Sequence, residues 1–227
     1  MKIVFFISLI FIQFGCTTTP TYKLAPTGSH EWKNGVAYLE NKNENIHVNV
    51  GFVRRDAKGY VFSVNISNLS QSSVDINPMN IICSRRVVAG EQKYEKPVRD
   101  PEYMYNTYNK SLERDQKSKS GGMAFLDLVV SISDIVERDP KKIAENEKRQ
   151  KEEDEDERDK QRRIVENTDK RKYWGNIALR RNTLHPNKSV FGDVICPTYI
   201  VGENGIDLTF SFGTSKNSFS WLSISSI

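Results

Sequence analysis

The strand pattern of this chain stops near residue 97 and resumes near residue 174, and this interruption constrains the fold more than any other feature. On both sides apolar residues alternate with polar ones, which predicts strands with one buried face. The clearest alternating positions are Ile46, Val48, Val50 and Phe52 before the gap and Ile206, Leu208, Phe210 and Phe212 after it. Neither set completes a core alone. We therefore expect residues 32–97 and 174–227 to form one β-domain, split by an insertion at residues 98–173.

Shorter alternating runs, separated by turn residues, predict an antiparallel β-sandwich. Residues 60–78 contain the run Phe-Ser-Val-Asn-Ile-Ser-Asn-Leu-Ser, and residues 183–194 contain a Leu-His-Pro-Asn-Lys turn followed by a strand. These two segments resemble the central hairpin and the later turn and strand of immunoglobulin-like sandwiches in exported bacterial proteins. The resemblance implies a mainly β, immunoglobulin-like fold with a helical, charge-rich insertion, and it carries no active site with it.

The first part of the insertion has helical periodicity. Tyr103, Tyr105 and Tyr108 follow Pro101 at spacings that place an aromatic face on a helix, which we expect to end at Gly121-Gly122. Residues 123–136 then predict an apolar helix that ends near Pro140. Its apolar residues surround much of the helix, so we expect it to be buried within the chain or against a partner protein. Candidate partner-binding residues in the insertion and just after it are Tyr103, Tyr105, Tyr108 and Trp174.

The second part of the insertion, residues 141–172, is almost entirely charged. Opposite charges recur at helical spacing, as in Glu145 with Arg149, and each such pair contributes about 0.2 to 0.5 kcal/mol to an isolated helix. The heptad positions between residues 146 and 163 are not apolar, which disfavours a coiled coil. We expect a solvated, projecting helix. The acidic run at residues 152–157 lacks the alternating oxygen ligands and central glycine of a calcium loop, so we predict no metal and no cofactor.

The N-terminus is built like a bacterial signal peptide. Lys2 precedes an apolar run at residues 3–12, which is too short to span a membrane, and Gly15-Cys16 follows. The segment resembles the lipobox of bacterial lipoproteins. This resemblance implies a signal peptide at residues 1–15, acylation of Cys16, for example by palmitate, and anchoring in a membrane of the cell envelope. The alternative is an ordinary signal peptide with Cys16 as a free thiol. Residues 16–31 are small and polar and predict a tether.

The remaining cysteines, Cys83 and Cys196, each close a strand-like run. An exported protein lies in an oxidising compartment, so a disulfide between neighbouring strands is one interpretation. Two buried free thiols are the other. Neither cysteine lies in a Cys-x-x-Cys spacing, which gives no support for a redox role.

The sequence contains no catalytic motif, and the net charge of +4, from 33 basic and 29 acidic residues, gives no reason to expect nucleic acid as a partner. The favoured hypothesis is a non-enzymatic envelope lipoprotein that binds or scaffolds another envelope protein. A second hypothesis is a carbohydrate or cell-wall binding module in which Trp32, Trp174, Trp221 and the tyrosines of the insertion stack on sugars. An enzyme with dispersed catalytic residues is a third, without a motif behind it.

The lipid anchor makes a direct prediction. Cells fed a radioactive fatty acid are expected to label the wild-type chain and not the Cys16→Ala variant, because the lipid is attached at Cys16. Label would be measured on the purified protein after gel electrophoresis. Equal labelling of both proteins would contradict the anchor.

Overall fold

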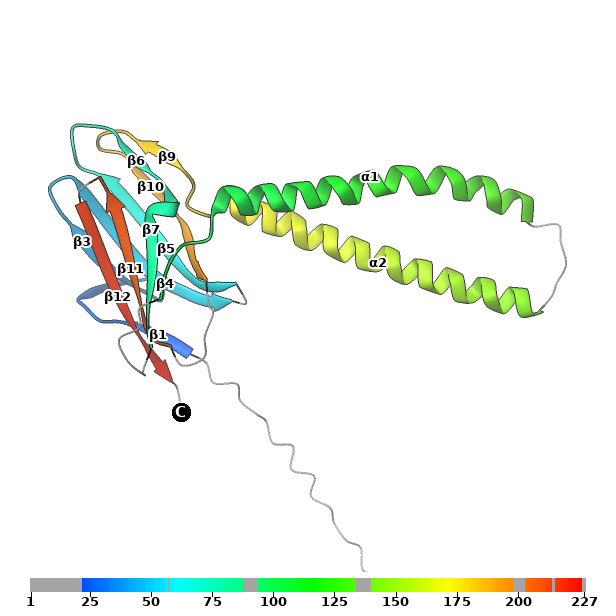
Figure 1. Cartoon of the computed structure of the whole chain (residues 1–227), viewed down its shortest axis with the longest axis horizontal. Coiled ribbons are helices and arrows are strands. Elements are labelled where there is room, and N and C mark those ends of the chain that lie inside the picture. The colour runs from blue at the N-terminus through cyan, green and yellow to red at the C-terminus, as the bar shows by residue number, and fades with distance from the viewer. Residues whose placement is uncertain are drawn as a thin grey trace, which may run out of the picture.

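The computed structural model describes residues 22–56, 58–87, 94–133, 140–197, 203–213 and 215–225. Two antiparallel sheets lie face to face, and a hairpin of two long helices extends from one side of them (Figure 1). The predicted mainly β fold with a helical insertion is confirmed. We call the sheets and their connections the two-sheet body.

Each sheet has five strands. The first contains, in spatial order, β1 (Tyr22–Pro26), β12 (Ser215–Ser225), β11 (Glu203–Phe212), β7 (Ile81–Val87) and β8 (Tyr94–Pro97). The second contains β10 (Ser189–Pro197), β5 (Gly59–Asn68), β4 (Ile46–Asp56), β3 (Val36–Lys42) and β2 (His30–Lys33). A short ladder joins β6 (Val74–Ile76) to β9 (Asn182–Leu184), and a 3-10 turn, η1 (Pro78–Asn80), precedes β7. In each sheet, strands from before and after the insertion are neighbours, so each sheet is complete only with strands from both halves of the sequence.

The hydrophobic core lies between the two sheets and contains the residues that alternate in the sequence. Val48 and Val50 of β4, Phe62 of β5 and Leu208 and Phe210 of β11 are each 0% exposed. Burying a side chain of this size contributes about 1.5 to 3 kcal/mol. The period-two pattern thus places one apolar face of every long strand in a shared core.

A disulfide joins Cys83 of β7 to Cys196 of β10, with the two Cα atoms 5.8 Å apart. The bond connects the two sheets across the core, so of the two interpretations of these cysteines the disulfide is the one present. The bonded residues are 113 positions apart in the chain. Cross-linking so long a loop reduces the entropy of the unfolded chain substantially.

The predicted tether is wrong for residues 22–31. Five residues of β1 pair with β12, and β2 pairs with β3 from His30↔Leu39 to Lys33↔Val36. Both are edge strands, bonded to a neighbour on one side through the main chain, so they do not need a regular apolar face. Residues 1–21, including Cys16 and the expected signal peptide, lie outside the described residues.

The insertion forms two helices, α1 (Pro101–Ser133) and α2 (Pro140–Asn176). The expected break at Gly121-Gly122 is wrong because α1 continues through both residues. A glycine costs a helix interior only about 1 kcal/mol, so two of them weaken a long helix without ending it. The side chains of the predicted apolar helix at residues 123–136 lie outside the described residues. None of the helices in the described part of the chain is long and apolar enough to cross a lipid bilayer.

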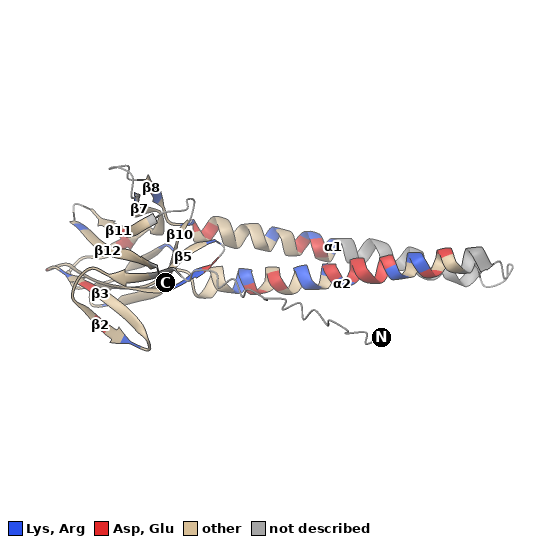
Figure 2. Ribbon diagram, turned by 90° about the horizontal axis from the view of Figure 1, so that it is seen from below, with Lys and Arg blue, Asp and Glu red and all other residues tan. Residues whose placement is uncertain are grey.

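The charged segment forms a solvated helix, as predicted. Every residue from 144 to 159 is exposed, and basic and acidic residues alternate along α2 in Figure 2. Ion pairs at i,i+4 spacing join Lys148 to Glu152 and Arg149 to Glu153, each at 3.8 Å. Arg149 therefore pairs with Glu153 on its C-terminal side, and not with Glu145 as the sequence analysis expected.

The cross-sheet disulfide generates a stability prediction. Cys83→Ala and Cys196→Ala, separately or together, are expected to lower the free energy of unfolding by about 2 to 5 kcal/mol, because each change removes the same bond. Urea unfolding of the three variants and of the wild type, with and without reductant, provides the measurement. Reduced wild type is expected to match the variants. If reductant does not change the free energy of unfolding of the wild type, the disulfide is contradicted.

Candidate functional site

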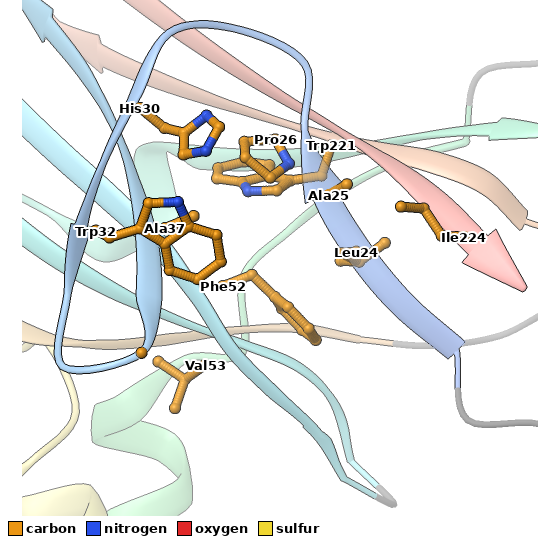
Figure 3. A pocket seen from close by; sticks show the side chains of 11 residues that line it. Leu24, Ala25, Pro26, His30, Trp32, Ala37, Phe52, Val53, Trp221 and Ile224 are labelled. Carbon is orange, nitrogen blue, oxygen red and sulfur yellow. The ribbon is translucent and has the colours of Figure 1, made fainter. Parts of the chain in front are cut away.

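A pocket opens at the edge of the two-sheet body where β1 and β12 of the first sheet face β2, β3 and β4 of the second (Figure 3). Its cavity volume is about 570 Å³. We call it the edge pocket. It is lined by Leu24, Ala25, Pro26, His30, Trp32, Gly35, Ala37, Phe52, Val53, Trp221 and Ile224. Apart from His30 and Gly35, every lining residue is apolar or aromatic.

Trp32 is the most exposed aromatic residue of the pocket, although its register places it on the inward face of its sheet. It pairs with Ala37, which shares a face with the buried core residue Leu39. Among the described residues, no strand of the first sheet lies beyond β1 to cover this inward-facing indole, and the His30 ring packs edge-on against it with ring centroids 5.7 Å apart. Trp32 is consequently 67% exposed.

Trp221 lies deeper and joins the pocket to the core. It is 0% exposed, and its ring centroid lies 4.7 Å from that of Phe62. In Figure 3, Trp32 and Phe52 come from the second sheet, and Trp221 and Leu24 come from the first. Aromatic and aliphatic side chains from both sheets therefore surround one hollow.

Few polar groups are available in the edge pocket. The Nδ1 atom of His30 lies 3.0 Å from the Gly28 carbonyl oxygen, and the buried Nε1–H of Trp221 has no hydrogen-bond partner among the described residues. No acidic or basic side chain other than His30 lines the cavity. Such a wall favours an apolar group and offers little to orient a charged or strongly hydrogen-bonding ligand.

A second cluster of apolar and aromatic residues fixes the helical hairpin to the body. It consists of the buried residues Val61, Trp174, Ala178 and Ile195, with Met104, Tyr105, Tyr108 and Tyr173 packed around them. We call it the base cluster. Val61 and Ile195 lie on the outer face of the second sheet, so this part of β5 and β10 is buried on both faces.

Cations surround the aromatic residues of the base cluster. Lys58 Nζ lies 5.1 Å from the ring centroid of Tyr108 and 5.9 Å from that of Trp174. Arg180 lies 5.2 Å from the Tyr105 centroid, and such cation–π contacts contribute about 0.5 to 1 kcal/mol at exposed sites. Arg180 also donates two hydrogen bonds to Glu102, which lower the pKa of that carboxyl.

Asp193 is the least exposed carboxylate beside the base cluster, at 8% exposure. The Tyr173 hydroxyl donates a hydrogen bond of 3.0 Å to its Oδ2 atom. Burial raises the pKa of Asp193, and the Tyr173 hydrogen bond and the charge of Arg54 partly offset that rise. Burial, followed by the nearby Asp193, raises the pKa of Tyr173. The hydrogen bond between Tyr173 and Asp193 thus joins α2 to β10.

The structure separates the aromatic residues that the sequence analysis grouped. Trp174 is 1% exposed and Tyr105 and Tyr108 pack around it, whereas Tyr103 is 67% exposed. The four residues therefore do not form one open surface. Of the three tryptophans, Trp32 and Trp221 share the edge pocket, and Trp174 lies in the base cluster.

The other walls of the pocket were not predicted from the sequence. Leu24 and Pro26 fell within the expected tether, and Phe52 was assigned to the core. The sequence signal for this pocket was the short segment that contains Trp32 and precedes the Asn34-Gly35 turn. Within the described ranges, no group of three or more His, Cys, Asp or Glu residues is placed to bind a metal ion. Comparisons of the chain with known protein families, curated proteins and solved structures found no match.

The raised pKa of Asp193 predicts a pH-dependent effect of Asp193→Asn. The folded state binds this proton more tightly than the unfolded state, where the pKa is near 3.8, so the wild type loses stability as pH rises through the folded pKa. Asparagine does not titrate and its amide oxygen still accepts from Tyr173. The free energy of unfolding of Asp193→Asn minus that of wild type is therefore expected to be larger at pH 7 than at pH 3.5. Urea unfolding at both pH values measures this difference.

The exposed residue Asp169 on α2 provides the matched control. Asp169→Asn is expected to show a smaller change between the two pH values. An Asp193→Asn difference that stays constant or shrinks as pH rises would contradict the assignment.

Proposed function

We propose that this protein is a lipid-anchored component of the bacterial cell envelope that binds or scaffolds another envelope protein without catalysing a reaction. In this proposal Cys16 carries the anchor, the two-sheet body is an immunoglobulin-like sandwich, and the helical hairpin contacts the partner. The observation that carries the proposal is the projecting hairpin: the described residues that pack it against the body lie at its base, and residues 144–159 of α2 are exposed.

The length of the hairpin supports a role in recognition. At a rise of about 1.5 Å per residue, a helix of 37 residues such as α2 extends about 55 Å. Its exposed segment at residues 144–159 contributes no side chain to either hydrophobic cluster. An extension on a rigid scaffold is a common place for binding residues.

The attachment at the base supports the same proposal because it determines the direction of the hairpin. Beyond the base cluster, Asn167 donates to Ser111 at 3.1 Å and Arg171 donates to Asn109 at 3.4 Å, which joins α2 to α1. A hairpin aligned in this way presents its charged surface at a defined angle to the body. Because both signs of charge alternate along α2, we expect a polar partner surface and binding that weakens with salt.

The immunoglobulin-like assignment draws support from the disulfide. Antibody domains carry a conserved disulfide between their two sheets, and Cys83–Cys196 likewise joins β7 of one sheet to β10 of the other. Two facing antiparallel sheets are common to many sandwich types, so the cross-sheet bond is the more specific observation.

Shortening the hairpin tests the proposed contact. Replacement of residues 116–163 by a short glycine-rich turn leaves the base cluster and the two hydrogen bonds between α1 and α2 in place. We expect this variant to keep the thermal midpoint of the body and to lose the partners that in-cell cross-linking recovers with the intact chain. Affinity purification after cross-linking, followed by mass spectrometry, provides the measurement.

A charge-exchanged variant provides the matched control for hairpin length. Asp154→Arg with Arg158→Asp keeps the helix length and net charge while reversing one exposed pair, and is expected to weaken recovery without abolishing it. If the shortened and intact proteins recover the same partners, the hairpin is not the contact.

A further inference from the structure

We propose that the edge pocket binds a single long acyl chain. The pocket has no assigned role in the proposed scaffolding function, and its chemistry is independent of the helical hairpin. The ligand belongs either to a free fatty acid or membrane lipid, or to the anchor on Cys16.

The lining residues favour an alkyl chain over other classes of ligand. Leu24, Phe52, Val53, Trp221 and Ile224 present aliphatic and aromatic surface from both sheets, and no acidic or basic side chain other than His30 reaches the cavity. Each methylene transferred from water into such surroundings is stabilised by about 0.8 kcal/mol. A phosphate or nucleotide would find no Lys or Arg among the lining residues.

A sugar is less well matched to this site. An exposed indole such as Trp32 can stack on a sugar ring, but specific recognition also needs polar groups that fix the hydroxyls. The His30 ring already lies against the Gly28 carbonyl oxygen, and Trp221 Nε1 is buried. The pocket therefore resembles a hydrocarbon site more than a glycan site.

The size and position of the pocket agree with an acyl chain. Its volume of about 570 Å³ lies within the range of roughly 300 to 1,000 Å³ that is usual for small-ligand sites. Its wall includes β1, which begins at Tyr22, six residues after Cys16. A fully extended segment of that length spans at most about 21 Å. An anchor on Cys16 would thus keep the pocket close to the acyl chains of a bilayer.

Photo-crosslinking of the full chain in cells tests the proposal. Cells that express the protein are fed a fatty acid with a diazirine group near its methyl end and are illuminated, and adducts are located by peptide mass spectrometry. We expect adducts on peptides that contain Trp32, Phe52 or Trp221. Adducts confined to other parts of the chain would overturn the proposal.

Two variants that fill the cavity sharpen this test. Ala37→Phe places a ring inside the pocket, and Val53→Trp does so from a residue that is already 37% exposed, so at least one of them is expected to fold normally. Both are expected to reduce pocket adducts to background, whereas Ala144→Phe on the exposed part of α2 leaves them unchanged. Pocket adducts that persist in a folded filling variant would overturn the proposal.

Cys16→Ala separates the two sources of the chain. Pocket adducts that persist in this variant identify a fatty acid or lipid that is not attached to the protein. Adducts that occur only in the wild type, joined to the peptide that contains Cys16, identify the anchor itself. Either result supports an acyl site, and the first does so even if the anchor is absent. Titration calorimetry with murein fragments is the competing measurement: binding that Ala37→Phe abolishes, without pocket adducts in cells, would replace the acyl chain by a glycan.

Discussion

The pairing of β5 with β10 is the interaction on which the rest of this structure depends. The ladder runs from Ser67↔Ser189 to Gly59↔Pro197 and joins a strand from before the insertion to one from after it. Its inner face contributes Phe62 and Val194 to the main core, and its outer face contributes Val61 and Ile195 to the base cluster. The same ladder thus closes the body and supports the helical hairpin.

The hairpin lowers the loop-closure entropy that this long-range strand pairing costs, compared with a flexible loop of the same length. Because α1 and α2 run back along each other, the two ends of the insertion return to the same strand. The Arg99 amide donates to the Ile195 carbonyl and the Asp193 amide donates to the Ile177 carbonyl, at 2.9 Å each. Gly192 permits this approach, since a Cβ there would lie 2.6 Å from backbone atoms of Leu179. Loop-closure entropy grows only logarithmically with length, so the insertion adds little cost once both ends are fixed to β10.

The sequence predicted those parts of the structure that depend on local periodicity, namely the long strands, the shared core and the solvated charged helix. It failed where one element covers another. Val61 alternates as an outward-facing residue, yet it is 0% exposed because Trp174 returns from the insertion to cover it. Leu24 was assigned to a tether because β1, an edge strand that pairs with β12 through its main chain, has no regular alternation of apolar and polar residues. The Gly121-Gly122 pair was expected to end the helix, but two glycines destabilise a helix of 33 residues too little to end it.

The three tryptophans show why the candidate site was harder to predict than the fold. Trp174 and Trp221 are covered and Trp32 is not, although all three are large apolar residues in or beside regular elements. The difference for Trp32 comes from the lateral extent of the opposite sheet, which in the described part of the chain ends at β1 and does not cover β2. Strand alternation specifies which face a residue occupies, but the extent of the facing layer depends on the order of strands from distant parts of the chain. An inward-facing aromatic residue left open by that order is a physical reason to expect an apolar ligand at this edge.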